Sequence, residues 1–375
     1  MDVSSYSWTQ WPEVAEEWRA LHAASTGGSA FTSVAWVSAW LHVFGPILKP
    51  RLYTLTAIGA VRAAWILVRR TDRWHGVPLR RVYFGTAGED EADSPCVEYN
   101  GLVCQPDFQE DALRAVESTL AESRWDELML HGVNLELAKT LSGNLPTAMR
   151  VAPVYGVDLK QVAQSGKPYL ELLSYNTRKQ IRRSRRFYEK RGPLTFDVAR
   201  DADQGLAMLD ELAALHQAAW HQRGKPGVFS SPLFCEFHRY LISRHFASVQ
   251  LFRVRAGDWG VGLLYNLVSQ GTVYTYQSGF QYEESNDARP GMVVTSLAIE
   301  YDLDNGIQYF DLTAGNAQYK KSLSTACCEL AWASTRSHTL RGRLRQWIDS
   351  RRPVQAGTEA GAKADASAGQ EDGAG

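Results

Sequence analysis

The sequence predicts an α+β chain of two tandem domains of the same kind, each a mixed, mainly antiparallel sheet flanked by helices. The first observation is an internal repeat. Leu21-His22-Ala23-Ala24 precedes Phe31-Thr32-Ser33, and Leu215-His216-Gln217-Ala218 precedes Phe229-Ser230-Ser231. The second is that each copy continues into a strand-turn-strand, a third strand, an irregular loop, a helix and a last strand. Solenoid units are much shorter, so the repeat indicates duplicated domains.

The first domain is expected over residues 1–153. Apolar residues at helical spacing predict its helices, and extended apolar runs bounded by turn residues predict its strands. The expected elements are helices over Trp11–Ala24, Phe31–Phe44 and Asp107–Ser123, and strands over Leu52–Ile58, Ala63–Val68, Val82–Gly85 and Trp125–Leu130.

The second domain is expected over residues 154–352. It opens with a strand and a helix, followed by a basic helix over 178–190 that Ser174 or Asn176 can cap. The later elements are helices over Asp203–His221, Pro232–Phe246 and Gly291–Asp304, and strands over Val249–Arg255, Val261–Leu267, Val273–Gln277, Gln308–Leu312 and Leu330–Ser334. Residues 353–375 are rich in Ala, Gly and acidic residues and hold no aromatic residue, so they are expected to be disordered.

Composition limits the classes of protein to consider. With 375 residues, 45% hydrophobic and 11% aromatic, the chain can form two proper cores. A net charge of −1 gives no overall field to attract nucleic acid or a membrane. No stretch approaches the roughly 20 apolar residues that span a bilayer, and the N-terminus lacks a signal-peptide pattern. A cytoplasmic protein without a membrane span is therefore expected.

Cysteine and histidine spacing predicts no metal site. Cys327 and Cys328 are adjacent, and neighbours on a strand point to opposite faces. The other three cysteines have no C-x-x-C partner, so all five are expected as free thiols. His216 and His221 lie at i and i+5, which do not share a helix face well.

The basic helix is the strongest charge feature. From Arg178 to Arg191 there are eight Lys or Arg residues and one acid, Glu189. Like charges one turn apart repel by about 0.2–0.5 kcal/mol per pair, which favours an anionic partner bound by Arg178, Arg182 and Arg185. That partner could be a nucleotide-linked substrate, a lipid pyrophosphate, RNA or an acidic glycan. The alternative is a solvated face whose arginines pair with acids of the other domain.

Several motifs together carry a family resemblance: Asn176 through Arg183, Trp220 with Arg223-Gly224, Pro290-Gly291, and Phe310-Asp311 through Gly315 to Tyr319-Lys320. In order and spacing they resemble the GNAT acyltransferase superfamily, in the tandem-domain branch similar to the CelD/BcsL group and, more remotely, the FemABX peptidyltransferases. The resemblance implies two GNAT-like domains, with a degenerate first domain and the chemistry in the second. It further implies an acyl-CoA donor such as acetyl-CoA and an amine acceptor, small or glycan-linked, in cell-envelope or exopolysaccharide biosynthesis.

The loop that would bind the donor departs from the family. GNAT enzymes usually carry Gln/Arg-x-x-Gly-x-Gly/Ala, whereas Arg289-Pro290-Gly291-Met292-Val293-Val294 has one glycine and a proline. A glycine still lets the backbone approach a phosphate, and a helix N-terminus still offers N–H groups. Contact of Arg289, Gly291, Met292 and Val293 with the donor is therefore expected. The alternative is an ordinary loop ending in Pro-Gly.

Three catalytic candidates lie after the last expected strand. Asp311 could deprotonate or orient an amine, or it could only form a turn by accepting from the N–H groups of Thr313 and Ala314. Tyr319 could donate a proton to a leaving thiolate. Lys320 could pair with a phosphate or carboxylate, or it could be a solvated lysine beside Lys321.

Three aromatic residues complete the candidate site. Tyr274 and Tyr276 alternate with Thr275 on a strand and so share a face, where they could line an acceptor pocket or pack in the core. The resemblance adds Trp220 to the substrate-binding residues.

The sequence thus predicts an acyl-CoA-dependent N-acyltransferase that needs no covalent enzyme intermediate. Two rivals stay open. One is a FemABX-like transferase that takes an aminoacyl group from tRNA, which the weak loop and the basic helix suit. The other is a non-catalytic, anion-binding accessory protein of polysaccharide synthesis.

Overall fold

The computed structural model of the chain describes residues 1–25, 28–74 and 76–350. The tail over 353–375, expected to be disordered, lies outside the described residues. None of the helices in the described ranges combines the length and the apolar character that crossing a bilayer requires.

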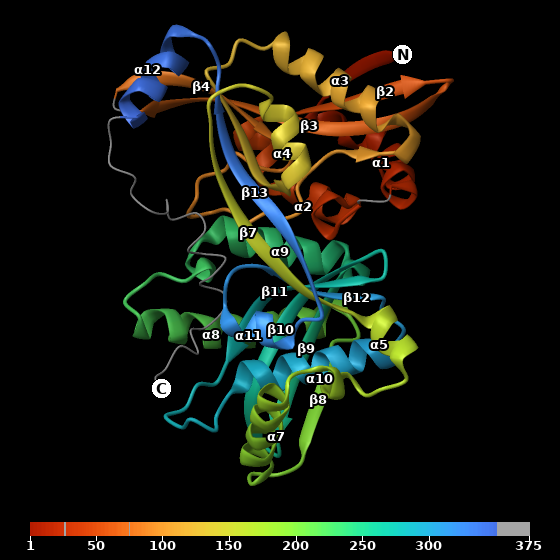
Figure 1. The fold of residues 1–375 in the computed structure, drawn as a ribbon, viewed down its shortest axis with the longest axis vertical. Helices are drawn as coiled ribbons and strands as arrows, with labels where there is room; N and C mark the ends of the chain where they lie inside the picture. The colour runs from red at the N-terminus through yellow and green to blue at the C-terminus, as the bar shows by residue number, and fades with distance from the viewer. Residues whose placement is uncertain (26–27, 75, 351–375) are drawn as a thin grey trace. The chain divides into compact units, whose positions relative to one another are not determined.

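The chain forms two compact units, called unit 1 and unit 2 below (Figure 1). Unit 1 contains residues 1–152 together with residues 329–350, and unit 2 contains residues 153–328. The sequence predicts that residues 154–352 form one domain. The structure instead places the segment from residue 329 onward in unit 1. It belongs to unit 1 because Leu330–Arg336 pair with the unit 1 strand over Glu127–Asn134.

The sheet of unit 1 has six strands that pair one after another, with helices packed against it. Its helices are α1 (Trp11–Ala24), α2 (Val34–Leu48), α3 (Gln109–Ala121), α4 (Leu135–Ser142) and α12 (Leu340–Ser350), and its strands are β1 (Asp2–Ser7), β2 (Arg51–Ala57), β3 (Ala60–Trp74), β4 (Val77–Phe84), β5 (Val103–Cys104), β6 (Glu127–Asn134) and most of β13 (Ala326–Arg336). The strand order is β1-β2-β3-β4-β6-β13, with β5 paired to β3. Among these described strands, only β4 and β6 pair in parallel.

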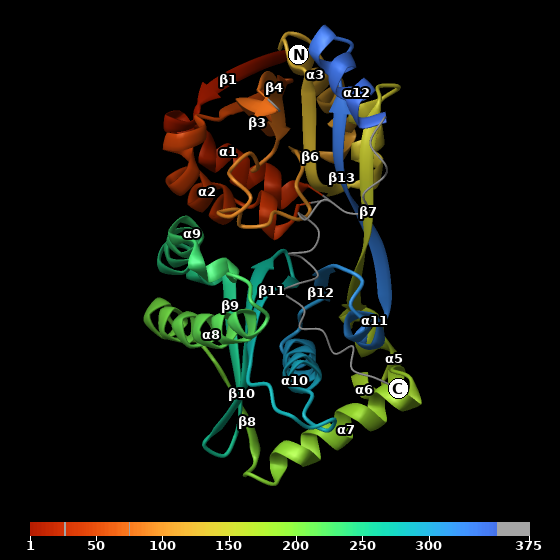
Figure 2. The same cartoon turned by 90° about the vertical axis from the view of Figure 1, so that its left-hand side faces the viewer.

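Unit 2 has the same kind of sheet. Its helices are α5 (Leu159–Ser165), α6 (Tyr169–Leu172), α7 (Tyr175–Glu189), α8 (Ala202–Gln222), α9 (Pro232–Arg244), α10 (Pro290–Asp304) and α11 (Gln318–Leu323), and its strands are the second half of β7 (Thr147–Asp158), β8 (Leu194–Val198), β9 (Val249–Ala256), β10 (Trp259–Ser269), β11 (Thr272–Phe280) and β12 (Tyr309–Ala314). In Figure 2, α8 and α9 lie on one face of this sheet, and α7 and α10 lie on the other.

The two units repeat one topology. The order β8-β9-β10-β11-β12-β7 in unit 2 matches β1-β2-β3-β4-β6-β13 in unit 1, and the parallel pair falls at the same place, between β11 and β12. The last strand of each path follows the strand–helix passage of the other unit, since β7 comes after β6-α4 and β13 after β12-α11. The predicted α+β fold of two similar units is confirmed.

Matching side chains explain why the repeat is visible in the sequence. Ser33 caps α2 by accepting from the Trp36 N–H at 3.2 Å, and Ser231 caps α9 by accepting from the Phe234 N–H at 3.1 Å. A side-chain cap of this kind stabilises a helix by about 1 kcal/mol. The Phe-x-Ser motif therefore repeats because both helices begin in the same way.

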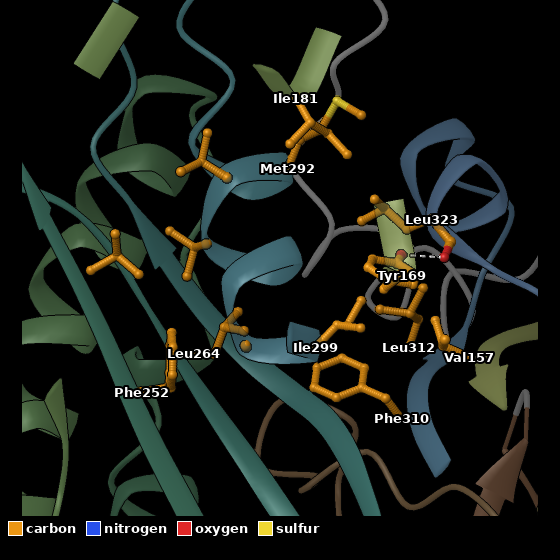
Figure 3. Packing of buried hydrophobic residues seen from close by; sticks show 14 of the residues in the cluster. Val157, Tyr169, Ile181, Phe252, Leu264, Met292, Ile299, Phe310, Leu312 and Leu323 are labelled. Atoms are coloured by element: carbon orange, nitrogen blue, oxygen red, sulfur yellow. Dashed lines mark hydrogen bonds between the residues drawn. The ribbon is translucent and has the colours of Figure 1, made fainter. Parts of the chain in front are cut away.

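The core of unit 2 explains how so basic a helix can pack. Ile181 of α7 is buried together with Met292 and Ile299 of α10 (Figure 3), and Tyr188 of α7 belongs to the same cluster. Burying one large apolar side chain contributes about 1.5–3 kcal/mol. This narrow stripe fixes α7 against α10, while most charged residues of the helix are exposed. The predicted cap is confirmed for Ser174, which accepts from the Thr177 N–H at 3.2 Å.

Candidate active site

The strands β11 and β12 part from each other in the middle of unit 2. Their parallel ladder covers only Thr272–Tyr274 against Tyr309–Asp311, although β11 continues to Phe280 and β12 to Ala314. A bulge in β11 at Tyr276 shifts its register with β10 just beyond the last rung. Bulges bend a strand and end regular pairing, and they recur beside active sites. We call this feature the β11/β12 divergence.

Polar atoms lack partners at this divergence. Thr275 Oγ1 and Gln277 Oε1 are buried, and neither has a hydrogen-bond partner in the described part of the chain. Thr313 Oγ1 on β12 donates to the Thr275 carbonyl at 3.1 Å, which links the two strands just beyond their ladder. Buried polar atoms are normally paired, so these two oxygens are available to accept hydrogen bonds from a ligand or water.

The equivalent place in unit 1 is filled by the chain itself. β4 ends at Phe84, and the Asn100 side chain donates to the Phe84 carbonyl at 2.8 Å. The Asn100 N–H donates to the Gly132 carbonyl at 2.9 Å, so this loop lies along β6 where β4 stops. A Cβ at Gly132 would lie 2.5 Å from the Val97 carbonyl oxygen, so the loop packs too closely for any other residue there. In unit 1 the place beside β6 beyond Phe84 is therefore occupied by the loop that contains Asn100.

Asp311 forms the last rung of the β11/β12 ladder, opposite Tyr274. It is 2% exposed, and its Oδ1 accepts from the Thr313 N–H at 2.6 Å. Thr313 has a φ of 60°, a left-handed conformation that a non-glycine residue adopts at a cost. The Asp311 carboxylate thus makes the turn contact considered from the sequence. A chemical role in addition to that contact stays a prediction.

Lys320 is buried, which rules out the solvated alternative. It is 2% exposed, and its ammonium group donates to the Ala314 carbonyl at 2.8 Å and approaches both oxygens of Thr313 at 3.4 Å. Its neighbour Lys321 is exposed. The short helix α11 therefore places a positive charge against the end of β12. Tyr319 is half-buried and packs against the unit 2 core.

The N-terminus of α10 presents backbone donors rather than side chains. Met292 and Val293 are buried in the core, so only their main chain can reach a ligand. Within the described residues the N–H groups of Gly291 and Met292 have no intramolecular acceptor, whereas that of Arg289 donates to Ser184 Oγ at 3.0 Å. A Cβ at Gly291 would sit 3.3 Å from the Phe280 ring. The residues predicted to contact the donor thus form a helix N-terminus suited to an anion.

Some basic side chains of α7 form hydrogen bonds or ion pairs with neighbouring parts of unit 2, which anchors them. Arg185 donates to Ser296 at 2.8 Å and to Glu300 at 2.9 Å, so it ties α7 to α10. Arg183 pairs with Asp287, and Arg191 makes a two-point contact with Glu283, which together hold the loop before α10. Arg178 donates to the Glu171 carbonyl at 2.8 Å. The pairing alternative is correct for part of the helix, but the acids belong to unit 2 itself.

A stripe of exposed residues remains on α7. Lys179, Arg182 and Arg186 are exposed at i, i+3 and i+7, which is one helix face, and none of them forms an ion pair or hydrogen bond with another described side chain. Tyr175 lies one turn before Lys179 on the same face and is 69% exposed. We call these four residues the α7 stripe. Of the three predicted substrate-binding arginines, only Arg182 belongs to it.

The predicted aromatic residues have structural partners. Tyr276 lies 3.2 Å from His238 Nε2 through its hydroxyl, and Tyr265 lies 3.1 Å from His238 Nδ1 in the same way. Burial lowers the pKa of His238 to about 3, so the imidazole is neutral at physiological pH. The Trp220 indole donates to His216 Nε2 at 2.9 Å. A substrate-lining role for these residues and for Tyr274 stays a prediction. Among the described residues no group of three or more His, Cys, Asp or Glu is arranged to hold a metal ion.

Sequence reasoning missed a buried carboxyl group on α10. Asp302 is 1% exposed, and its Oδ1 accepts from Gln250 Nε2 at 2.6 Å. Gln250 in turn accepts from Asn266 at 2.7 Å. Burial raises the pKa of Asp302 to about 7. Only the periodicity of α10 could have indicated that this residue faces the sheet.

Replacing Asp302 with Asn should stabilise the protein at pH 8 but not at pH 5. The folded-state pKa is raised, so the folded protein holds the proton more tightly than the unfolded chain. That contribution is present at low pH and is lost as the pH rises toward about 7, at up to about 1.4 kcal/mol per pH unit. Urea unfolding at both pH values measures the difference. Asp304→Asn, an exposed change on the same helix, is the control, and a pH-independent difference for Asp302→Asn would contradict the account.

Comparison with known proteins identifies the second unit. Residues 175–321 match the family described as "Acetyltransferase (GNAT) domain". Unit 2 is a GNAT acyltransferase domain. The match begins at the first residue of α7 and ends directly after Lys320, so it contains the β11/β12 divergence, the α10 N-terminus and the α7 stripe. The predicted superfamily and the acyltransferase class are confirmed.

Solved structures support the tandem arrangement at the level of fold. The crystal structure of FemX aligns with a TM-score of 0.58 at 12% identity, covering 93% of this chain and 100% of that one. The structure of L-PGS from Bacillus licheniformis aligns with a TM-score of 0.53 at 13% identity, covering 90% of this chain and 97% of that one. The C-terminal domain of a putative lysylphosphatidylglycerol synthetase from Agrobacterium fabrum aligns at 0.53 and 11%, covering 90% and 96%. The comparison with curated proteins yields no match.

Proposed function

We propose that the chain is an acyl-CoA-dependent N-acyltransferase whose chemistry takes place at the β11/β12 divergence of the GNAT domain. The proposal rests on a difference between the two units at this divergence and at the equivalent place in unit 1. The divergence in unit 2 keeps orphaned polar atoms, while the loop at Asn100 fills the equivalent place in unit 1. We therefore infer that unit 1 is a degenerate copy and that the donor binds only in unit 2.

In this proposal the donor pyrophosphate would bind at the N-terminus of α10. The free N–H groups of Gly291 and Met292 and the positive end of the helix dipole favour an anion there. The side chain of Arg289 adds a cation at the same end. The Phe280 ring, which faces Gly291, limits how deeply a phosphate group can enter. The CoA thioester would then extend along the open edge of β11.

The transfer step needs no covalent enzyme intermediate. The acceptor amine attacks the thioester carbonyl, the C–N bond forms, and the C–S bond breaks to release the CoA thiolate. Backbone N–H groups along β11 would hold the tetrahedral oxyanion. Asp311 would orient or deprotonate the amine, and Tyr319 would supply a proton to the thiolate. Lys320 would lower the energy of negative charge that develops beside the end of β12.

The α7 stripe favours a second candidate for the donor. Three unpaired cations and an exposed tyrosine on one helix face suit a polyanion with stacking bases. An aminoacyl-tRNA could therefore be the donor, with the amine attacking an ester in place of a thioester. Under the acyl-CoA proposal the same stripe binds an anionic part of the acceptor, such as a nucleotide-linked or lipid-linked glycan of the cell envelope. The two versions differ in which substrate depends on the stripe.

Separate titrations with acetyl-CoA and with aminoacyl-tRNA test the proposal. Acetyl-CoA at about 100 times its Kd should stabilise the protein by about 2.7 kcal/mol, seen as a rise in melting temperature. The variant Lys179→Gln, Arg182→Gln, Arg186→Gln should keep that response, because the stripe lies outside the donor site. A control variant with Arg200→Gln, Lys225→Gln and Arg244→Gln makes the same charge change at exposed positions of unit 2.

The outcomes separate the two donors. If aminoacyl-tRNA alone stabilises the protein, and only the stripe variant weakens that binding with a reduced salt dependence, the donor is aminoacyl-tRNA. If neither compound changes the melting temperature, the site does not bind an acyl donor and the proposal is wrong.

A further inference from the structure

The C-terminal helix α12 exposes three of its apolar residues. Leu340, Leu344 and Trp347 lie at i, i+4 and i+7 and therefore share one helix face. They are 85%, 42% and 52% exposed, respectively. In a helix that packs by its apolar face, these three positions would be buried. We call this face the α12 ridge.

Two arginines of α12, Arg341 and Arg345, contact other parts of unit 1. Arg341 donates to the Pro78 carbonyl at 3.1 Å. The Arg345 guanidinium lies over the Trp74 ring at 4.2 Å, and its Nε is 3.7 Å from the buried Glu127 carboxylate. Close packing also fixes the start of the helix, since a Cβ at Gly342 would lie 2.3 Å from the Ser337 carbonyl oxygen. Ile348, one turn after Arg345, is half-buried. The helix is thus held on the side of Arg341, Arg345 and Ile348, while the three residues of the ridge are exposed.

Positive charge surrounds the ridge. Arg341 and Arg343 are exposed beside it. In the sequence, Asp349 is the only acid between 340 and 350. Leucine and tryptophan on one face with arginine around them is the composition of helices that lie in the interface of a lipid bilayer.

We propose that α12 docks unit 1 on an anionic membrane surface. The α12 ridge inserts Leu340, Leu344 and Trp347 at the level of the lipid headgroups, and the neighbouring arginines contact lipid phosphates. The charge favours this occupant over a second copy of the chain. A two-fold dimer through the ridge would bring Arg341 and Arg343 against the same arginines of its partner. Three side chains also fall well short of the roughly 800 Å² per partner of a stable interface.

Co-sedimentation of the full chain with vesicles tests the proposal. The wild type should bind vesicles of equal parts phosphatidylglycerol and phosphatidylcholine. Leu340→Ser, Leu344→Ser, Trp347→Ser should weaken binding at least about tenfold, since it removes the apolar side chains that would enter the bilayer interface. Val3→Ser, Ile47→Ser, Ile58→Ser is the matched control, because it removes three exposed apolar side chains from other parts of unit 1 and should bind as the wild type does.

A second variant keeps the test independent of folding. Arg343→Glu should weaken binding to the anionic vesicles and leave binding to pure phosphatidylcholine vesicles unchanged, with an unaltered melting temperature. The proposal is overturned if the ridge variant binds vesicles as well as the wild type, or if the wild type does not bind them. It is also overturned if sedimentation without lipid shows a dimer that the ridge variant loses, because the ridge would then be an interface between copies.

Discussion

Replacing Lys320 with Met should lower the turnover number by about 100- to 1,000-fold, the range found when a single preorganised donor is removed from an active site. The side chain is buried, and its ammonium group is held by the Ala314 carbonyl at 2.8 Å. Methionine keeps the length of the side chain but removes the charge. The release of free CoA from acetyl-CoA in the presence of an amine acceptor measures the effect.

The neighbouring lysine provides the control. Lys321→Met makes the same chemical change one residue away at an exposed position and should leave turnover unchanged. A melting temperature for each variant separates loss of chemistry from loss of folding, since Lys320→Met also removes a hydrogen-bond partner from the Ala314 carbonyl. Full turnover in Lys320→Met would assign the lysine to holding the 313–314 turn and nothing more.

Replacing Asp311 with Asn should lower the turnover number by about 100-fold while acyl-donor affinity stays nearly constant, as for a group that acts as a general base. Asparagine keeps an oxygen that can accept from the Thr313 N–H, so the turn contact at 2.6 Å can survive. The negative charge is lost. Steady-state kinetics and calorimetric donor titration together give the separation between turnover and binding.

Asp311→Ala completes this experiment because it removes the turn contact as well. It should lower both turnover and the melting temperature, since the left-handed Thr313 loses the hydrogen bond that stabilises it. If Asp311→Asn keeps full turnover and only Asp311→Ala is impaired, the carboxylate serves the turn alone and the catalytic role is wrong.

Much of the fold could be predicted because short sequence motifs and apolar periodicity reveal the repeat. The Phe-x-Ser caps at Ser33 and Ser231 and the apolar periodicity of α10 locate their elements without knowledge of the tertiary structure. The strands β1 and β8 were not predicted. Both lie at an end of their strand path, and neither has a fully buried residue. β1 shows no regular alternation of apolar and polar residues, whereas β8 does alternate as Leu194-Thr195-Phe196-Asp197-Val198, a strand signal that went unused.

The prediction of the domain boundary was wrong for a different reason. β13 continues without a break from Ala326 to Arg336, yet its residues from 329 onward belong to unit 1. Pairing between β13 and β6 joins segments far apart in the sequence, and no local property of Leu330–Arg336 specifies that partner.

The candidate site was only partly predictable. The positions of Asp311 and Lys320 after the last strand follow from the sequence pattern, but the burial of Lys320 does not, because an isolated Lys-Lys pair is normally solvated. The distinction between anchored Arg185 and exposed Arg182 also needs tertiary contacts, here with Glu300. The β11/β12 divergence depends on the register of two strands separated by α10, which the sequence alone does not give.

Hydrogen exchange measured with and without acetyl-CoA tests the central claim most directly, because it reports where the donor binds. At about 100 times its Kd, acetyl-CoA should slow exchange by up to about 100-fold in peptides covering 275–280 of β11 and 289–293 at the start of α10. The peptide covering 97–103 of unit 1 should exchange at an unchanged rate. Protection in unit 1, or no protection at either place in unit 2, would contradict the account.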